Sequence, residues 1–160
     1  LIPRIMEYQW YQDLEKTPSQ FEIQQGSYEH SGDLVQRLSK ESSLKYQKMS
    51  LKHNTILQDG KPWKKQKSAP LLVIGDSFTG VYELTQPKSS GIAAHIAYGT
   101  RVPVDLVTSW GGGPNVGQRM LKAKKKYLKE TRLVIYMMAS RDYWNYSQMW
   151  KPAEFPQIEK

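Results

Sequence analysis

The stretch Leu71-Leu72-Val73-Ile74-Gly75-Asp76-Ser77 decides the fold. Its four apolar residues in a row, closed by a glycine, are typical of a strand buried on both faces of a parallel sheet. Apolar runs at 102–108 and 133–138 predict two further strands. Pro103 fits the first of these only near the strand start, because proline cannot donate to a sheet ladder.

Helices are expected between these strands. Ser89, Ser90 and Gly91 predict the start of a helix that continues to about Tyr98. A second helix is predicted over 115–129, after a tight loop at 111–114. Strand, helix, strand, helix, strand with short links implies right-handed crossovers and a doubly wound parallel sheet. We therefore expect an α/β fold of the flavodoxin-like, three-layer α/β/α kind, with an incomplete copy of it as an open alternative.

The chain divides near residue 70. Residues 70–160 are predicted to form the α/β core, and the polar residues 1–69 a remnant or extension of that domain. Within the polar part, residues 34–46 suggest one amphipathic helix, and 60–68 predict an exposed basic loop. Three aromatic residues could pack on a core elsewhere in the chain: Tyr8, Trp10 and Tyr11.

Composition limits the classes of function. The 160 residues include 23 Lys and Arg against 15 Asp and Glu, a net charge of +8 that would suit a polyanion. Cysteine is absent, which excludes disulfides, thiolate zinc sites and cysteine nucleophiles. The longest uncharged apolar runs fall far short of the roughly 20 residues of a membrane span, so no transmembrane segment is expected. The chain begins with Leu1, which predicts a processed or truncated piece.

All three predicted strands end in polar or glycine-rich residues, at 75–77, 109–112 and 139–142. Ligands of parallel α/β sheets bind at this carboxyl edge. The first of these ends is not a P-loop, because Val81 and Tyr82 stand where lysine and a hydroxyl residue belong. It also departs from the nucleophile elbow of α/β-hydrolases, whose second glycine is replaced here by Thr79.

Gly75-Asp76-Ser77 after the first strand resembles the first block of the SGNH (GDSL-type) hydrolase superfamily. Gly111 or Gly112 matches the second block, and 139–142 stands at the third, where Arg141 replaces the usual asparagine. Together with Gly32-Asp33-Leu34 upstream, these departures make the chain similar to the alginate O-acetyltransferase-type SGNH-like branch. Members of that branch modify bacterial exopolysaccharides.

The resemblance implies roles for individual residues. Ser77 would be the nucleophile, and Gly111 or Gly112, with Arg141, would hold the oxyanion or the substrate. An ion pair with Asp142 or Asp76 is the alternative for Arg141. Asn115 is a candidate substrate contact, although capping of the following helix is favoured. Asp76 is expected to cap or brace the turn rather than to act as an acid.

The base that would activate the serine is the open point. In this branch an Asp-x-His pair precedes the serine block, whereas His30 and His53 are preceded two positions back by Tyr28 and Leu51. Three alternatives follow. The pair lies upstream of Leu1, which we favour; the chain is a non-catalytic relative; or His30 or His53 acts as the base through a different geometry.

The resemblance thus implies a serine O-acetyltransferase or acetylesterase acting on a bacterial polysaccharide, in the periplasm or secreted, with partner proteins of an exopolysaccharide machinery. The acyl donor stays open. No cofactor or metal is implied, and no recognised nucleic-acid module is present. The alternatives are a catalytically degenerate carbohydrate-binding or scaffold domain, and a basic module that binds a polyanion.

Overall fold

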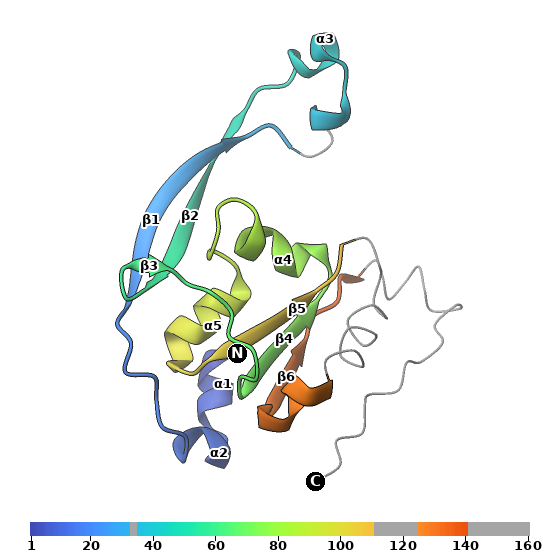
Figure 1. The fold of residues 1–160 in the computed structure, drawn as a ribbon. Helices are drawn as coiled ribbons and strands as arrows, with labels where there is room; N and C mark the ends of the chain where they lie inside the picture. The colour runs from blue at the N-terminus through green and yellow to red at the C-terminus, as the bar shows by residue number, and fades with distance from the viewer. Residues whose placement is uncertain (33–34, 111–124, 141–160) are drawn as a thin grey trace, which may run out of the picture.

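The computed structural model describes residues 1–32, 35–110 and 125–140 (Figure 1). The elements follow in the order α1 (Ile2–Met6), α2 (Gln9–Gln12), β1 (Phe21–His30), η1 (Val35–Arg37), α3 (Lys40–Ser43), β2 (Met49–Gln58), β3 (Lys61–Pro62), β4 (Leu71–Gly75), α4 (Ser77–Leu84), α5 (Ile92–Thr100), β5 (Val104–Thr108), η2 (Lys125–Glu130) and β6 (Leu133–Tyr136). The η elements are 3-10 helices. The fold is a mixed α/β arrangement, as the sequence predicts.

The three predicted strands form one parallel sheet in the order β5-β4-β6. Leu71 pairs with Val104 on one side and with Leu133 on the other, so β4 is the central strand. The strands are shorter than the apolar runs suggest. β5 starts at Val104, just after Pro103, which places the proline before the ladder as expected.

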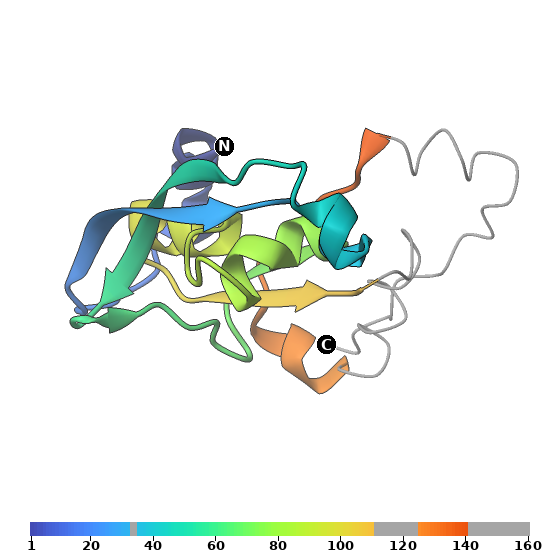
Figure 2. The ribbon, with the colours of Figure 1, turned by 90° about the horizontal axis from the view of Figure 1, so that it is seen from above.

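Both faces of this sheet are buried. Leu71 and Val73 of β4 belong to a large core with Val104, Leu106 and the apolar face of α5. The alternate residues Leu72 and Ile74 pack on the opposite face with Val107 and with Leu128 of η2. Figure 2 shows α4 and α5 on one side of β5 and η2 on the other. Burial on both faces explains why β4 is continuously apolar rather than alternating.

The chain between β4 and β5 forms two helices. α5 begins after its N-cap Gly91 and buries Ala93, Ala94, Ile96 and Ala97, which confirms the helix predicted from Ser89 to Tyr98. The sequence analysis did not predict α4, which starts at Ser77 directly after the sheet edge. The second helix was predicted over residues 115–129. Residues 115–124 lie outside the described residues, and the chain from Lys125 onward forms the 3-10 helix η2.

A long antiparallel hairpin was missed in the polar N-terminal part. β1 and β2 pair over ten positions, from Phe21 opposite Gln58 to His30 opposite Met49. Figure 1 shows this hairpin running away from the parallel sheet, with α3 near its far end. Asp59 and Gly60 both have positive φ and connect β2 to β3. Asp-Gly is the preferred pair for such a two-residue turn, so the sequence carried a hairpin signal here.

The amphipathic helix predicted over residues 34–46 is wrong. The described part of this segment holds the 3-10 helix η1 and the single-turn helix α3, which begins afresh because the Ser39 hydroxyl accepts a hydrogen bond from the Ser42 N–H. Leu38, Tyr46 and Leu44, the last 79% exposed, do not pack on the core. Most of the stability of a helix comes from packing its apolar face on a core. Because these side chains do not pack, only the short helices η1 and α3 form here.

The exposed basic loop predicted over residues 60–68 is wrong for Trp63, which is only 5% exposed. Its backbone N–H donates to the Ile56 carbonyl, and its side chain belongs to the same core as Leu71. Lys64 and Lys67, by contrast, are exposed as expected. The exposed lysines therefore flank a tryptophan whose side chain is buried in the core.

The N-terminal helices pack on α5. Ile5 is buried in the core, and the Tyr11 hydroxyl donates to the Thr100 carbonyl at 2.9 Å. Trp10 packs against the same core, whereas Tyr8 is exposed. Tyr11 and Trp10 thus act as the predicted anchors, and Tyr8 does not. The division of the chain near residue 70 stays a prediction, with residues from both sides of it contributing to one core.

Within the described residues, no helix is both long enough and apolar enough to cross a membrane.

Candidate active site

Ser77 lies where the sequence predicts it, at the carboxyl edge of the central strand. It is the first residue of α4 and is half-buried, one residue after its N-cap Asp76. Because β4 lies between β5 and β6, this position is the middle of the described sheet edge. Ligands of parallel sheets bind at this edge. The serine hydroxyl is therefore placed for contact with a bound molecule.

Asp76 caps α4, which confirms the role expected for it. Its Oδ1 accepts a hydrogen bond from the Phe78 N–H at 2.9 Å. Its carbonyl accepts from the Thr79 N–H at 3.2 Å and from the Thr108 hydroxyl at 2.6 Å. The backbone just before Ser77 is thus held from its own helix and from the neighbouring strand β5.

Two glycines let α4 lie close against the sheet. A Cβ at Gly75 would stand 2.0 Å from Thr79 Oγ1, and a Cβ at Gly80 would stand 2.8 Å from Thr108 Oγ1. Neither distance can be accommodated by an ordinary side chain. Close packing against Thr79 therefore explains why the Gly-Asp-Ser motif has a glycine at position 75. The resulting turn from β4 into α4 is tight and fixes the position of Ser77.

The end of β5 contributes a second polar group to this edge. The Ser109 N–H donates to the Gly75 carbonyl at 3.3 Å, and its hydroxyl is buried without a hydrogen-bond partner among the described residues. Beside it stand two exposed aromatic side chains, Trp110 at 56% and Phe78 at 63%. The sheet edge around Ser77 thus combines hydroxyl groups with exposed aromatic surface.

The backbone electrostatics of this position suit a developing negative charge. α4 is eight residues long, and its first backbone N–H groups point out of the helix start where Ser77 lies. The positive end of the helix dipole lies at the same place. Acyl-transfer enzymes use backbone N–H groups of this kind as oxyanion donors, and that role for the Ser77 N–H stays a prediction.

The two candidate histidines lie on the hairpin. His30 Nδ1 accepts a hydrogen bond from the Gly32 N–H at 2.8 Å, so the proton of its neutral ring is on Nε2. A serine-activating histidine needs the opposite tautomer, with Nε2 as acceptor. His53 Nδ1 lies 3.2 Å from Thr55 Oγ1, which lies 3.0 Å from Ser90 Oγ. His53 can therefore donate from Nδ1 and keep Nε2 as an acceptor.

Four other predicted site residues, Gly111, Gly112, Asn115 and Arg141, lie outside the described residues. Their proposed contacts with the oxyanion or substrate stay predictions.

The sequence analysis missed Glu83, near the far end of α4 from Ser77. Its side chain is 6% exposed, and Oε1 accepts a hydrogen bond from the Ala94 N–H at 2.8 Å. Burial raises the pKa of this carboxyl group to about 7, against the opposing effect of hydrogen bonds from Ala94 and Ala93. No sequence signal was available, because α4 was not predicted and the burial of Thr79, one helical turn before Glu83, is known only from the structure.

Comparison with solved structures confirms the class of fold that the sequence resemblance implies. No protein-family model matches the chain, and no curated protein matches its sequence. The solved structures that share its fold include two from Pseudomonas. The O-acetyltransferase domain of Pseudomonas putida AlgJ matches with a TM-score of 0.59 at 19% identity, covering 93% of this chain and 48% of that one. Pseudomonas aeruginosa AlgX matches with a TM-score of 0.59 at 12% identity, covering 86% of this chain and 30% of that one. This chain thus spans less than half the length of either.

Proposed function

We propose that the chain is the serine-bearing part of an SGNH-like acyl-ester enzyme, an O-acetyltransferase or acetylesterase acting on a bacterial polysaccharide. The likeness to the AlgJ O-acetyltransferase domain supports transfer as the reaction. We also propose a periplasmic or secreted location, partner proteins of an exopolysaccharide machinery and a complete three-layer arrangement. The packing of α5 and η2 on opposite faces of the sheet supports that arrangement.

The observation that carries this proposal is the position of Ser77. It stands at the start of α4 and at the end of the central strand, and its preceding carbonyl is held by the Thr108 hydroxyl. A fixed backbone suits a nucleophile, since its oxygen must stay aligned with the acyl carbon and with the oxyanion donors.

The proposed reaction has two steps. In the first, Ser77 Oγ loses its proton to a base and bonds to the acyl carbon, while the carbonyl oxygen becomes an oxyanion facing the Ser77 N–H. Collapse of this intermediate breaks the bond to the leaving group, which departs with the proton. In the second step, a sugar hydroxyl or water attacks the acyl-enzyme, gives up its proton to the base and restores the Ser77 hydroxyl.

We propose that the base belongs to an Asp-x-His pair preceding Leu1, as the family resemblance implies. Of the two histidines on the hairpin, His53 has the more suitable hydrogen bonding, because its Nδ1 partner is a hydroxyl that can accept. His30 would first have to give up its bond from Gly32. His53 is therefore the second choice for the base.

A scaffold or carbohydrate-binding domain without catalysis is the second candidate. It is favoured by the hydrogen bond that His30 Nδ1 accepts from the Gly32 N–H, which holds that ring in the tautomer unsuited to a base. The exposed aromatic side chains of Phe78 and Trp110 beside Ser77 would serve such a domain as sugar-stacking surfaces.

Burst kinetics separate the two candidates. The assay uses the protein carrying the proposed Asp-x-His pair, because Ser77 needs its base to react. With p-nitrophenyl acetate as acyl donor, we expect a burst of p-nitrophenol from the wild type and from Ser39→Ala, which alters an exposed serine at the N-cap of α3. Ser77→Ala should show no burst while keeping the thermal stability of the wild type. Equal release by wild type and Ser77→Ala would refute the nucleophile and favour the scaffold.

A further inference from the structure

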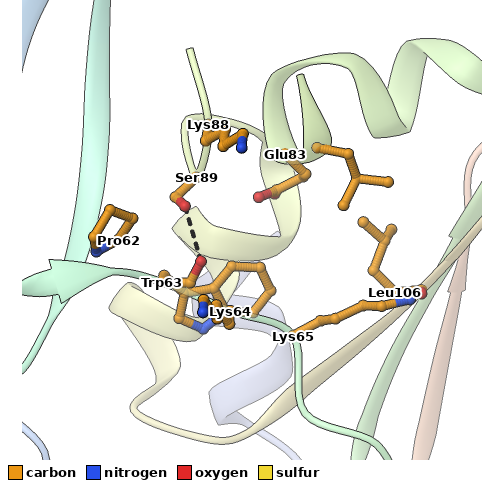
Figure 3. A pocket seen from close by; sticks show the side chains of 9 residues that line it. Pro62, Trp63, Lys64, Lys65, Glu83, Lys88, Ser89 and Leu106 are labelled. Carbon is orange, nitrogen blue, oxygen red and sulfur yellow. Dashed lines mark hydrogen bonds between the residues drawn. The ribbon is translucent and has the colours of Figure 1, made fainter. Parts of the chain in front are cut away.

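A second concave site lies at the opposite end of α4 from Ser77. It is a pocket of about 370 Å³ between the segment after β3, the end of α4, the loop before α5 and β5 (Figure 3). Its apolar lining comes from Pro62, Trp63, Leu84 and Leu106. This volume lies in the range of pockets that bind small molecules. The proposed acyl-transfer reaction does not use this pocket.

The pocket contains a buried polar atom without a partner. Glu83 Oε2 is buried and makes no hydrogen bond to any described residue, whereas Oε1 accepts from Ala94. Figure 3 shows the Glu83 carboxyl group directed at the space between Ser89, Lys88 and Trp63. Leaving a buried polar atom unpaired costs about 1–3 kcal/mol. The exposed side chains of Leu84 and Lys88 border the pocket.

Among the described residues that line the pocket, every charged group other than Glu83 is cationic. Lys64 and Lys65 line the pocket from the segment after β3, and Lys88 from the loop before α5. Lys65 Nζ donates to the Leu106 carbonyl at 2.6 Å, which leaves Lys64 and Lys88 as the exposed ammonium groups. β5 contributes only apolar Leu106, and α5 contributes the N–H groups of Ala93 and Ala94. The pocket therefore carries positive charge while the Glu83 carboxyl is neutral.

We propose that this pocket binds a small carboxylate with an apolar body. The body would lie against Trp63, Leu84 and Leu106, and the ligand's carboxylate would accept a hydrogen bond from the protonated Glu83 Oε2. Lys64 and Lys88 would neutralise its charge at the rim. This arrangement supplies the missing partner for Oε2 and explains why one acidic residue is buried among three lysines.

The proposal predicts binding that weakens as pH rises, since ionised Glu83 repels an anion and has no proton to donate. Because burial raises the pKa of Glu83 to about 7, the affinity should fall about thirtyfold between about pH 6 and about pH 8.5. Benzoate is a suitable probe, being ionised throughout this range. Its neutral isostere benzamide tests the need for charge, and glucuronate tests the need for an apolar body.

Calorimetric titration of the whole chain tests the proposal. Benzoate should bind more tightly than benzamide or glucuronate at about pH 6, and the double variant Lys64→Met/Lys88→Met should weaken it about tenfold. Lys52→Met, which removes an exposed lysine of β2, should leave the affinity unchanged. Glu83→Gln keeps a side-chain donor, so it should bind benzoate at both pH values without the thirtyfold fall.

Three results would overturn the proposal: benzoate binding no tighter than benzamide, an unchanged affinity in the double lysine variant, or the same pH dependence in Glu83→Gln. The lysine variant is confined to exposed side chains, so it tests the pocket even if Glu83→Gln fails to fold. None of these titrations depends on Ser77. Failure of the binding proposal would therefore not count against the proposed acyl-transfer reaction.

Discussion

Replacing Glu83 by glutamine is expected to remove a pH dependence from the stability of the chain. The Glu83 carboxyl is buried against the start of α5, and burial raises its pKa from 4.5 to about 7. Its pKa in the folded state is therefore higher than in the unfolded state. Between these two values the folded chain holds a proton that the unfolded chain has lost, so the free energy of unfolding falls as pH rises through this window.

The size of the effect follows from the shift in pKa. One pKa unit corresponds to about 1.4 kcal/mol, so Glu83 should lower the free energy of unfolding by about 2 to 3 kcal/mol between about pH 5 and about pH 8. Glutamine has nearly the same shape and can still accept the Ala94 hydrogen bond through its oxygen, but it does not titrate. Its stability should lack this component at every pH.

Urea unfolding followed by circular dichroism at several pH values measures the difference. Other carboxyl and histidine groups also titrate, so the informative quantity is the wild-type value minus the Glu83→Gln value at each pH. Glu22→Gln, on the exposed face of β1, serves as the matched control for replacing a glutamate by glutamine. If the Glu83→Gln difference is flat from about pH 5 to about pH 8, the burial argument for Glu83 is wrong.

Three further predictions concern the packing around Ser77 and the N-terminal helices. Asp76→Ala should cost about 1 kcal/mol by removing the cap of α4, whereas Asp76→Asn should keep it; chemical denaturation of both variants distinguishes capping from other roles. Gly75→Ala should cost about 1–3 kcal/mol or prevent folding, because its Cβ would collide with Thr79 Oγ1; a melting temperature equal to wild type would contradict the close packing. Tyr11→Phe should lower the free energy of unfolding by about 1 kcal/mol through loss of the buried hydrogen bond to Thr100, with no effect on the p-nitrophenol burst.

The parallel sheet could be predicted from the sequence because burial on both faces requires continuously apolar strands. A strand such as β4, with every residue buried, is apolar throughout and stands out in a polar chain. The helix α5 was equally clear, since a glycine and two serines precede a run of small and branched apolar residues. The position of Ser77 followed from the end of β4 alone, without knowledge of α4.

The hairpin was missed because its inward face is not apolar. Gly26, Tyr28 and His30 alternate with exposed residues along β1, and His53 of β2 packs over Gly26. Glycine, tyrosine and histidine on the half-buried face give no hydrophobic alternation, which is the pattern on which strand prediction depends. The Asp59-Gly60 turn connects β2 to β3, so it indicates only that shorter antiparallel pair.

The prediction that Trp63 lies in an exposed loop was wrong because charged neighbours hid a buried residue. Its neighbours Lys61, Lys64 and Lys65 dominate any local average of polarity, yet the indole is buried in the main core. Lysine side chains reach solvent from beside a buried residue, so a charged run does not report the position of an aromatic residue within it. The same overlap of lysines and apolar surface forms the pocket at Glu83.

Trapping the acyl-enzyme tests the central claim most directly. The wild-type protein carrying the proposed Asp-x-His pair is incubated with p-nitrophenyl acetate, quenched in acid, digested and mapped by mass spectrometry. The account predicts an acetyl ester on the peptide that contains Ser77, absent from Ser77→Ala and present at the same occupancy in Ser39→Ala. Acetylation confined to lysines, or equal in the wild type and in Ser77→Ala, would contradict the assignment of Ser77 as the nucleophile.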